Sequence, residues 1–125
     1  MKKLFISCPM KGRTEENIRK TMDKMHKIAE IVFEQELEVI PSYIEDNPPK
    51  DSKEAVWYLG KSIQLMSQAD YFIGVDWSYG YWAGCGIEAQ VASDYGIPAY
   101  TIDIKKLEPD CMEILSRKAQ TGPGN

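Results

Sequence analysis

The sequence predicts a single α/β domain built on a parallel sheet of four or five strands with helices on both faces. Short apolar runs alternate with longer stretches of helical periodicity in the order βαβαβαβα, in units of about 30 residues. The chain has 125 residues, of which 43% are apolar and 27% charged, as is typical of one soluble domain with a hydrophobic core. We expect the domain to span residues 1–118 and a flexible tail to span residues 119–125.

The first strand and helix are indicated by an apolar run that gives way to helical spacing. Residues 4–7 predict a buried strand that leads into a loop over residues 8–13. Thr14 is the expected N-cap of the helix, and Glu15 and Glu16 suit the positive end of its dipole. The apolar stripe of this helix recurs at spacings of three and four: Ile18, Met22, Met25, Ala29 and Val32.

The second strand is expected over residues 37–40 and stops at Pro41. Residues 42–49 contain two prolines and predict a loop, after which helical spacing returns over residues 53–67. The third strand, residues 71–75, is the clearest in the chain, because its nearly continuous apolar character suits a strand covered on both faces. It ends at Asp76.

The last third of the chain predicts a loop, a helix, a strand and a final helix. Residues 77–82 form an aromatic loop, and helical spacing begins at Ala83 with Ile87, Val91, Ala92 and Tyr95 on one side. Gly96 is the expected residue after the helix C-cap, and Pro98 prevents continuation. We expect a fourth strand over residues 99–104 and a helix from about residue 108 to 118.

Composition excludes several functional classes. Fifteen Lys and Arg against nineteen Asp and Glu give a net charge of −4, which argues against a dedicated nucleic-acid binder. Cys8, Cys85 and Cys111 are far apart and form no CxxC pair, so neither a disulfide framework nor a zinc site is expected. The N-terminal apolar run is too short for a signal peptide, and no later stretch suits a membrane span. We therefore expect a cytoplasmic protein without a membrane partner.

The candidate site lies where the first three strands end. Ligands of open parallel sheets bind at the carboxyl ends of the strands, near the point where the strand order reverses. The loops at this edge cover residues 7–13, 43–46 and 76–88. Ser7 opens the first loop, and we expect Tyr43 and Asp76 to help shape the pocket and set its preference for a base.

The loop made of Met10, Lys11, Gly12 and Arg13 leads into a helix N-terminus. Two cations and free backbone N–H groups could bind an anion such as a nucleotide phosphate. An ordinary solvated loop is the other interpretation, since neither GxGxxG nor GxxxxGK[ST] is present.

Residues 84–88 place Glu88 near a helix start, after two glycines that allow close backbone approach. The helix dipole would keep this carboxylate ionised and available as a nucleophile. Helix capping by an acidic residue is the alternative.

The aromatic loop also has two interpretations. Trp77, Tyr79, Tyr81 and Trp82 occur within six positions. Their rings could stack on a nucleobase or pack into a subunit interface, and both could be true. The single histidine, His26, lies far from this edge, so a histidine-dependent catalytic triad is not expected, and no residue pattern indicates a metal or cofactor.

Short motifs in a fixed order give the chain a resemblance to the nucleoside 2-deoxyribosyltransferase superfamily, in particular to a branch of small phage and bacterial proteins. The resemblance runs from Lys3 to about Tyr100 and is carried by LFISCPMKG (residues 4–12), VWYLGKS (56–62), SQAD (67–70), GCGIE (84–88) and YGIP (95–98). It implies a doubly wound, flavodoxin- or Rossmann-like domain over residues 1–118 that acts on the N-glycosidic bond of a nucleoside or nucleotide.

The resemblance also implies roles for individual residues. The family nucleophile falls on Glu88, which would attack the anomeric carbon and form a glycosyl-enzyme intermediate. Residues 10–13 fall where nucleotide-hydrolysing relatives hold the 5′-phosphate, and Trp82 and Gly84 fall in the loop that faces the sugar and phosphate. No cofactor is implied.

One departure from the family pattern concerns Ser62, which stands where active relatives carry an aspartate. A serine cannot replace a carboxylate as an acid. Either Asp46 or Asp76 takes over part of that role, or the protein binds nucleotides without cleaving them efficiently.

Three functional hypotheses follow. The leading one is an enzyme that cleaves or exchanges N-glycosidic bonds of (deoxy)nucleosides or their 5′-monophosphates. The second is a non-catalytic nucleotide-binding protein that senses or sequesters its ligand, and the third is a scaffold whose aromatic loop contacts only protein. The resemblance and the aromatic loop also predict a homodimer or a larger homo-oligomer.

Overall fold

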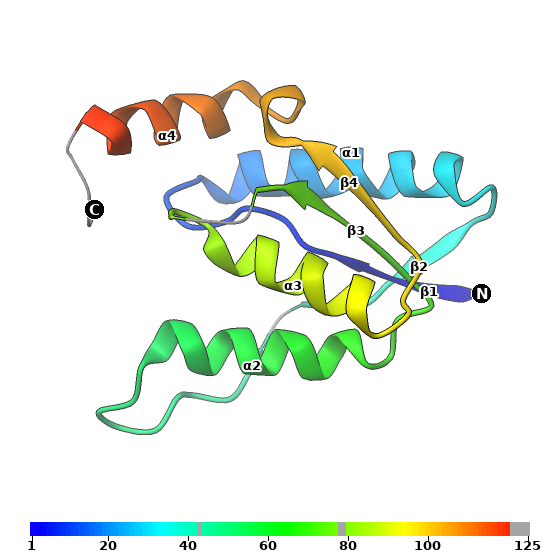
Figure 1. Cartoon of the computed structure of the whole chain (residues 1–125), viewed down its shortest axis with the longest axis horizontal. Helices are drawn as coiled ribbons and strands as arrows, with labels where there is room; N and C mark the ends of the chain where they lie inside the picture. Colours follow the sequence, from blue (N-terminus) through cyan, green and yellow to red (C-terminus); the bar gives the residue numbers. More distant parts are fainter. Residues whose placement is uncertain (43, 78–79, 121–125) are drawn as a thin grey trace.

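The computed structural model describes residues 1–42, 44–77 and 80–120, which form an α/β fold with an all-parallel sheet (Figure 1). Within these residues the sheet has four strands, the lower of the two expected numbers. The alternation of strands and helices is confirmed. The elements are β1 (Lys2–Ile6), α1 (Glu15–Val32), β2 (Leu37–Val39), α2 (Glu54–Met66), β3 (Tyr71–Asp76), α3 (Ala83–Asp94), β4 (Ala99–Asp103), the short 3₁₀ helix η1 (Ile104–Lys106) and α4 (Pro109–Gln120).

The strand order β2-β1-β3-β4 places β1 and β3 in the centre of the sheet. Phe5 pairs with Phe72 between these strands, and Leu4 pairs with Val39 of β2. The chain moves outward from β1 to β2 and then crosses back to β3 on the other side. The strand order therefore reverses between β1 and β3, which is the position that binds ligands in sheets of this kind.

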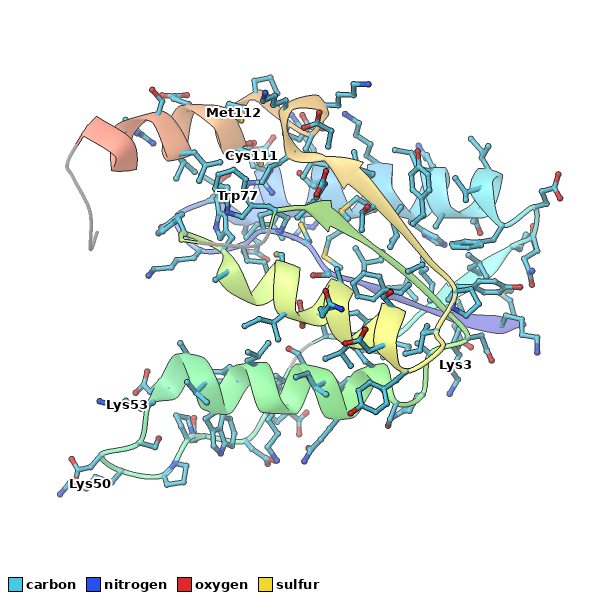
Figure 2. All side chains as sticks on the ribbon, viewed as in Figure 1. Lys3, Lys50, Lys53, Trp77, Cys111 and Met112 are labelled. Atoms are coloured by element: carbon cyan, nitrogen blue, oxygen red, sulfur yellow. The ribbon has the colours of Figure 1, made fainter. Side chains whose placement is uncertain are left out.

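Helices cover both faces of the sheet, as expected. In Figure 1, α1 and α4 lie on one face, and α2 and α3 lie on the other. Side chains alternate across β1 accordingly: Leu4 and Ile6 pack in the core beneath α1 and α4, whereas Phe5 stacks on Phe72 beneath α2 and α3. Cys111 of α4 is completely buried in the first of these cores, while its neighbour Met112 is exposed (Figure 2).

Local signals in the sequence explain where the helices begin and end. Thr14 caps α1 as expected, because its hydroxyl oxygen accepts a hydrogen bond from the backbone N–H of Asn17 at 3.1 Å. Gly96 follows Tyr95, the C-cap of α3, with φ +78°, and the N–H of Ile97 donates to the carbonyl of Ala92 at 2.9 Å.

Other boundaries differ by one or two residues from the expected ones. β1 begins at Lys2, because two exposed lysines precede its apolar part and still pair with β2 through the backbone. The expected fourth strand ends at Asp103, whose carboxylate accepts from the N–H of Lys105 and starts η1. α4 extends to Gln120, beyond the expected residue 118, and the rest of the expected tail lies outside the described residues.

Candidate functional site

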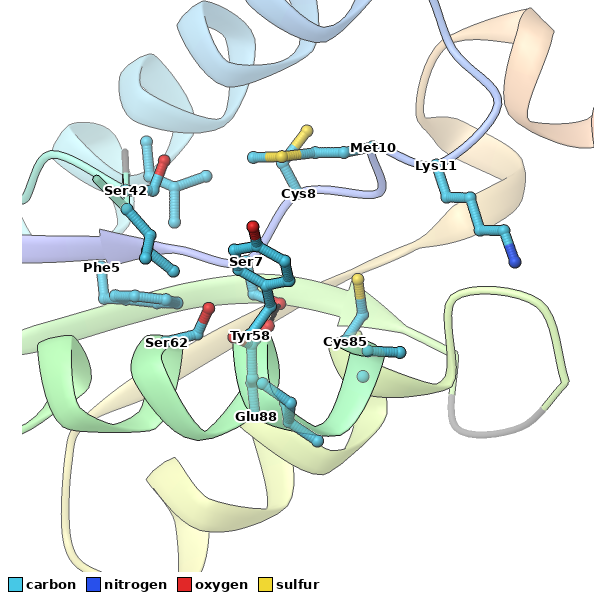
Figure 3. Close-up of a pocket in the computed structure, with 15 residues that line it drawn as sticks. Phe5, Ser7, Cys8, Met10, Lys11, Ser42, Tyr58, Ser62, Cys85 and Glu88 are labelled. Atoms are coloured by element: carbon cyan, nitrogen blue, oxygen red, sulfur yellow. Dashed lines mark hydrogen bonds between the residues drawn. The ribbon is translucent and has the colours of Figure 1, made fainter. Parts of the chain in front are cut away.

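A cavity of about 480 Å³ opens between the end of β1 and helices α2 and α3 (Figure 3). It therefore lies at the point where the strand order reverses, on the face of the sheet that α2 and α3 cover. Most of its wall is apolar, and its polar side chains come from four separate parts of the chain. The lining residues are Phe5, Ile6, Ser7, Cys8, Met10, Lys11, Ser42, Ile44, Ala55, Tyr58, Leu59, Ser62, Gly84, Cys85 and Glu88.

Glu88 reaches this cavity because it belongs to the buried side of α3. The buried residues of this helix are Cys85, Glu88 and Ala92, at spacings of three and four. The expected apolar side of α3 is therefore only partly correct, since Ile87 is 44% exposed and Tyr95 is 82% exposed. Glu88 is 8% exposed and occupies a place where a core helix would normally carry an apolar side chain.

The carboxylate of Glu88 is held by hydroxyl groups. The hydroxyl of Ser7 donates to Oε1 of Glu88 at 2.7 Å, in a buried hydrogen bond that joins the end of β1 to α3. Burial raises the pKa of Glu88, and hydrogen bonds from Ser7 and Ser62 oppose this shift by stabilising the ionised form. Among the described residues, Glu88 takes part in no ion pair.

Ser7 is fixed by the sheet. Its backbone N–H donates to the carbonyl of Ile73 at 2.8 Å, which extends the pairing of β1 with β3 beyond the last residue of β1. Ser7 is 2% exposed and lies beside Gly74, where a Cβ would stand 3.5 Å from that of Ser7 and only 2.7 Å from the ring of Phe72. The close packing of Phe72 on Gly74 thus supports the strand end that carries Ser7.

Lys11 lies at one end of the cavity, and Phe5 and Ser42 lie at the other (Figure 3). The ammonium group of Lys11 is 5.0 Å from the centre of the Tyr81 ring, and its backbone carbonyl accepts from the indole N–H of Trp82 at 2.9 Å. Gly12 has φ +81°, and a Cβ there would lie 2.6 Å from the Tyr81 hydroxyl. The loop that carries Lys11 is therefore attached to the aromatic loop ahead of α3.

Arg13 does not line the cavity, although it belongs to the loop in which a phosphate site was expected. Its side chain is 0% exposed, and its guanidinium forms a two-pronged ion pair with Asp110 of α4, at 2.8 and 3.0 Å. It also donates to the carbonyl of Pro9 at 2.9 Å and to the hydroxyl of Thr21 at 2.6 Å. These partners saturate Arg13 inside the fold and leave Lys11 as the loop cation that faces the cavity.

The other acidic candidates also lie away from Glu88. Asp46 is exposed and pairs with Lys61 at 3.2 Å, beside a separate groove between α2 and the loop before it. Asp76 is exposed at the end of β3 and does not line the cavity. Tyr43 lies outside the described residues.

The aromatic loop packs largely against its own domain. Trp82 is 8% exposed, initiates α3 with φ +65° and does not line the cavity. Trp77 and Tyr81 pack against the core beneath α1 and α4, and the indole N–H of Trp77 donates to the carbonyl of Tyr81 at 2.6 Å. Tyr79 lies outside the described residues.

Sequence reasoning missed the wall that α2 contributes. Ala55, Tyr58, Leu59 and Ser62 all line the cavity, and their spacing of three, one and three places them along one side of a helix. Ser62 was already expected to bind the substrate. Counting back one and two helical turns from Ser62 would have found the other lining residues of α2. Among the described residues, two aromatic side chains line the cavity, of which Phe5 is buried and Tyr58 is 38% exposed.

The thiols near the cavity are in their neutral form. Burial raises the pKa of Cys8 and of Cys85 to about 12. His26 belongs to α1, where its Nε2 lies 2.8 Å from the carbonyl oxygen of Leu37 and 3.3 Å from the Glu30 carboxylate. Within the described part of the chain, no group of three or more His, Cys, Asp or Glu side chains could hold a metal ion.

None of the helices that the structure describes is both long and apolar enough to cross a membrane. Comparisons of the chain with protein-family models, with curated proteins and with solved structures find no match. The functional argument for this protein therefore depends on its own cavity and on the side chains that line it.

Proposed function

We propose that this protein cleaves or exchanges the N-glycosidic bond of a (deoxy)nucleoside or a nucleoside 5′-monophosphate, with Glu88 as the nucleophile. The observation that carries the proposal is a buried carboxylate on the wall of a cavity where the strand order reverses. Among the residues that the structure describes, this carboxylate has no ion-pair partner. Burying a charge without a counter-ion destabilises a fold, so a chemical role explains Glu88 better than packing does.

The reaction needs one carboxylate close to the anomeric carbon. An oxygen of Glu88 forms a bond to that carbon while the bond to the base nitrogen breaks, and the base leaves with the electron pair and takes a proton from solvent. The negative charge of Glu88 stabilises the positive charge that develops on the sugar. Water or a second base then attacks the glycosyl ester and releases Glu88.

The cavity suits a small-molecule ligand of this class. Its volume of about 480 Å³ falls within the range of roughly 300–1,000 Å³ of typical ligand pockets. Tyr58 offers a ring on which a base can stack, and Lys11 offers a cation to a 5′-phosphate. Gly84 lines the cavity at the N-terminal part of α3, in the segment that the resemblance assigns to the sugar and phosphate.

The resemblance to the nucleoside 2-deoxyribosyltransferase superfamily supports the same reaction. The motif GCGIE ends at Glu88, and the motif LFISCPMKG contains Ser7 and Lys11. Both motifs contribute side chains to one cavity. We infer that the domain is of the doubly wound, flavodoxin- or Rossmann-like kind, to which the order β2-β1-β3-β4 corresponds.

A second function, binding of a nucleotide without cleavage, is favoured by the set of acids in the cavity. Among the described residues that line it, Glu88 is the one carboxylate, and Ser62 stands where the resemblance implies an aspartate. While Glu88 is ionised, the described lining residues therefore include no carboxylic acid that could donate a proton to the departing base.

The experiment incubates the protein with each deoxynucleoside and ribonucleoside and with its 5′-monophosphate, with and without an acceptor base. Released or exchanged base is measured by chromatography, and intact mass spectrometry detects a glycosyl group on Glu88. We expect base release from the parent protein and none above background from Glu88→Gln.

Asp46→Asn and Asp76→Asn are the matched controls, because they remove exposed carboxylates outside the cavity and should release base at the parent rate. Base release from Glu88→Gln at the parent rate would disprove the assigned nucleophile. Binding by calorimetry without any turnover would favour the second function. Failure of every nucleotide to raise the melting temperature would favour the scaffold hypothesis.

A further inference from the structure

Among the described residues, the ionised form of Glu88 is stabilised by neutral hydroxyl groups and not by a cation. Ser7 donates to Oε1 at 2.7 Å, and the hydroxyl of Ser62, which lines the same cavity, also lowers the pKa of this carboxylate. Burial is the largest influence on its pKa, followed by these two hydroxyls. In the described part of the chain, Glu88 has no lysine, arginine or histidine partner.

The two hydroxyls approach Glu88 from different elements. Ser7 follows β1, Ser62 belongs to α2 and Glu88 belongs to α3 (Figure 3). The backbone of Ser7 is fixed to β3 by its hydrogen bond to Ile73, and Ser62 is fixed by the helix around it. The bond from Ser7 is therefore in place before any ligand binds, and the hydroxyl of Ser62 lies on the wall of the same cavity.

We propose that Ser7 and Ser62 are positioning residues, whose hydroxyls keep the Glu88 carboxylate charged inside the fold and orient it toward the cavity. This inference rests on the proposed function, because it explains how a buried carboxylate stays reactive. An arginine or lysine would also keep Glu88 charged, but a tight ion pair would compete with the developing positive charge on the sugar. Neutral donors stabilise the carboxylate and add no such positive charge.

The other titratable groups that line the cavity do not stabilise the charge of Glu88. They are Lys11 from the loop after β1, Tyr58 from α2, and the thiols of Cys8 and Cys85. Burial raises the pKa of both thiols to about 12, so they bring no negative charge to the cavity at about pH 7. Lys11 lies over Tyr81 at the end of the cavity.

The first measurement is the titration of Glu88 itself in the ligand-free protein. Its side-chain carboxyl carbon is followed by NMR in ¹³C-labelled protein and assigned by the loss of that signal in Glu88→Gln. We expect Ser7→Ala and Ser62→Ala each to raise the pKa of Glu88, and Ser62→Thr, which keeps the hydroxyl, to restore it. Ser42→Ala is the matched control, because Ser42 also lines the cavity but does not bond to Glu88, and it should leave this pKa unchanged.

The second measurement is the pH dependence of kcat/KM for base release. Both alanine variants should move the acidic limb of the profile to higher pH, with kcat/KM at a fixed pH on that limb lowered about tenfold for each unit of the shift. A merely structural role would lower kcat/KM by the same factor at every pH.

The inference is overturned if Glu88 titrates identically in the parent, Ser7→Ala and Ser62→Ala. If Ser7→Ala does not fold, the comparison of Ser62→Ala with Ser62→Thr decides. A raised pKa in the alanine variants together with no base release from any nucleoside would retain the positioning role and refute the proposed reaction. The two failures are therefore distinguishable.

Discussion

At the residue scale, Glu88 is a charged side chain in a place that the packing of α3 reserves for an apolar one. Cys85 and Ala92, one turn before and one turn after it, are buried in the ordinary way. Burial makes the ionised form of Glu88 unfavourable, and two hydroxyls recover only part of that cost. The fold thus contains a local source of instability at the position that we assign to chemistry.

This instability predicts how the stability of the protein depends on pH. Because burial raises the pKa of Glu88 above its ordinary value of 4.5, the folded protein binds this proton more tightly than the unfolded chain. The stability that this tighter proton binding contributes is fully present at pH values below 4.5. It is lost as the pH rises through the pKa that Glu88 has in the folded protein. Glu88→Gln should therefore melt at a higher temperature than the parent at about pH 7.

The advantage of Glu88→Gln should shrink as the pH falls toward about 4, where both states of the parent are protonated. Melting curves followed by circular dichroism between these two pH values test the prediction. A difference in melting temperature that is the same at every pH would contradict it. Glu113→Gln is the control, since Glu113 is an exposed carboxylate on α4.

The sequence was sufficient to select Glu88 but not to interpret Arg13. Glu88 could be selected because it follows two glycines near a helix start and because the resemblance assigns the family nucleophile to this position. It lies in the second turn of α3 and not in the first, so burial and not the helix dipole dominates its pKa. Arg13 and Lys11 are both basic residues of the same short loop, so their local sequence does not distinguish them. The burial of Arg13 depends on its ion pair with Asp110, which is 97 positions away. Long-range contacts of this kind carry no local signal, so the loop after β1 could be located but the different surroundings of its two cations could not be predicted.

At the element scale, the ion pair of Arg13 and Asp110 joins the loop after β1 to α4. The guanidinium also bonds to Thr21 of α1, so one side chain connects three elements on the same face of the sheet. Strands and helices themselves could be predicted from apolar spacing and caps, and most boundaries agree within two residues. The contact between α4 and the loop after β1 could not be predicted, because apolar spacing does not show which helix packs against which loop.

This junction predicts a large loss of stability in Arg13→Met. The substitution leaves the Asp110 carboxylate, which is 21% exposed, without its partner, and breaking a buried pair typically costs about 3–5 kcal/mol. Arg19→Met is the matched control, because the pair of Arg19 with Glu15 is exposed and should contribute less than about 1 kcal/mol.

Urea unfolding of the two arginine variants measures both effects. An unchanged midpoint for Arg13→Met, combined with weaker binding of a nucleoside monophosphate, would contradict the structural role. It would return Arg13 to the phosphate site in which the sequence placed it.

At the scale of the whole molecule, the strand order determines where the cavity lies. β1 and β3 are both central, and the reversal between them brings the ends of β1, α2 and α3 together on one face. This arrangement could be predicted once the strands and their order of connection were known. The individual side chains of α2 that complete the wall depend on the rotation of that helix, which the apolar pattern of its sequence leaves open.

The rim of the cavity bears on the predicted homo-oligomer. Met10 and Tyr58 line the cavity and remain 39% and 38% exposed in the single chain. A second copy that covers this rim would bury both side chains and enclose the ligand. We expect a dimer or larger species in sedimentation equilibrium at micromolar concentration, and Tyr58→Glu to shift it toward the monomer. A parent protein that is monomeric throughout this range would contradict the expectation.

The ion pair between residue 13 and residue 110 also has a consequence for the order of folding. Lys11 and Arg13 share the loop after β1, yet the carboxylate that neutralises Arg13 is 97 positions away in the sequence. Closing a chain segment of this length is entropically unfavourable and slow compared with forming a helix. We therefore expect the loop after β1 to be anchored to α4 only after the individual helices have formed.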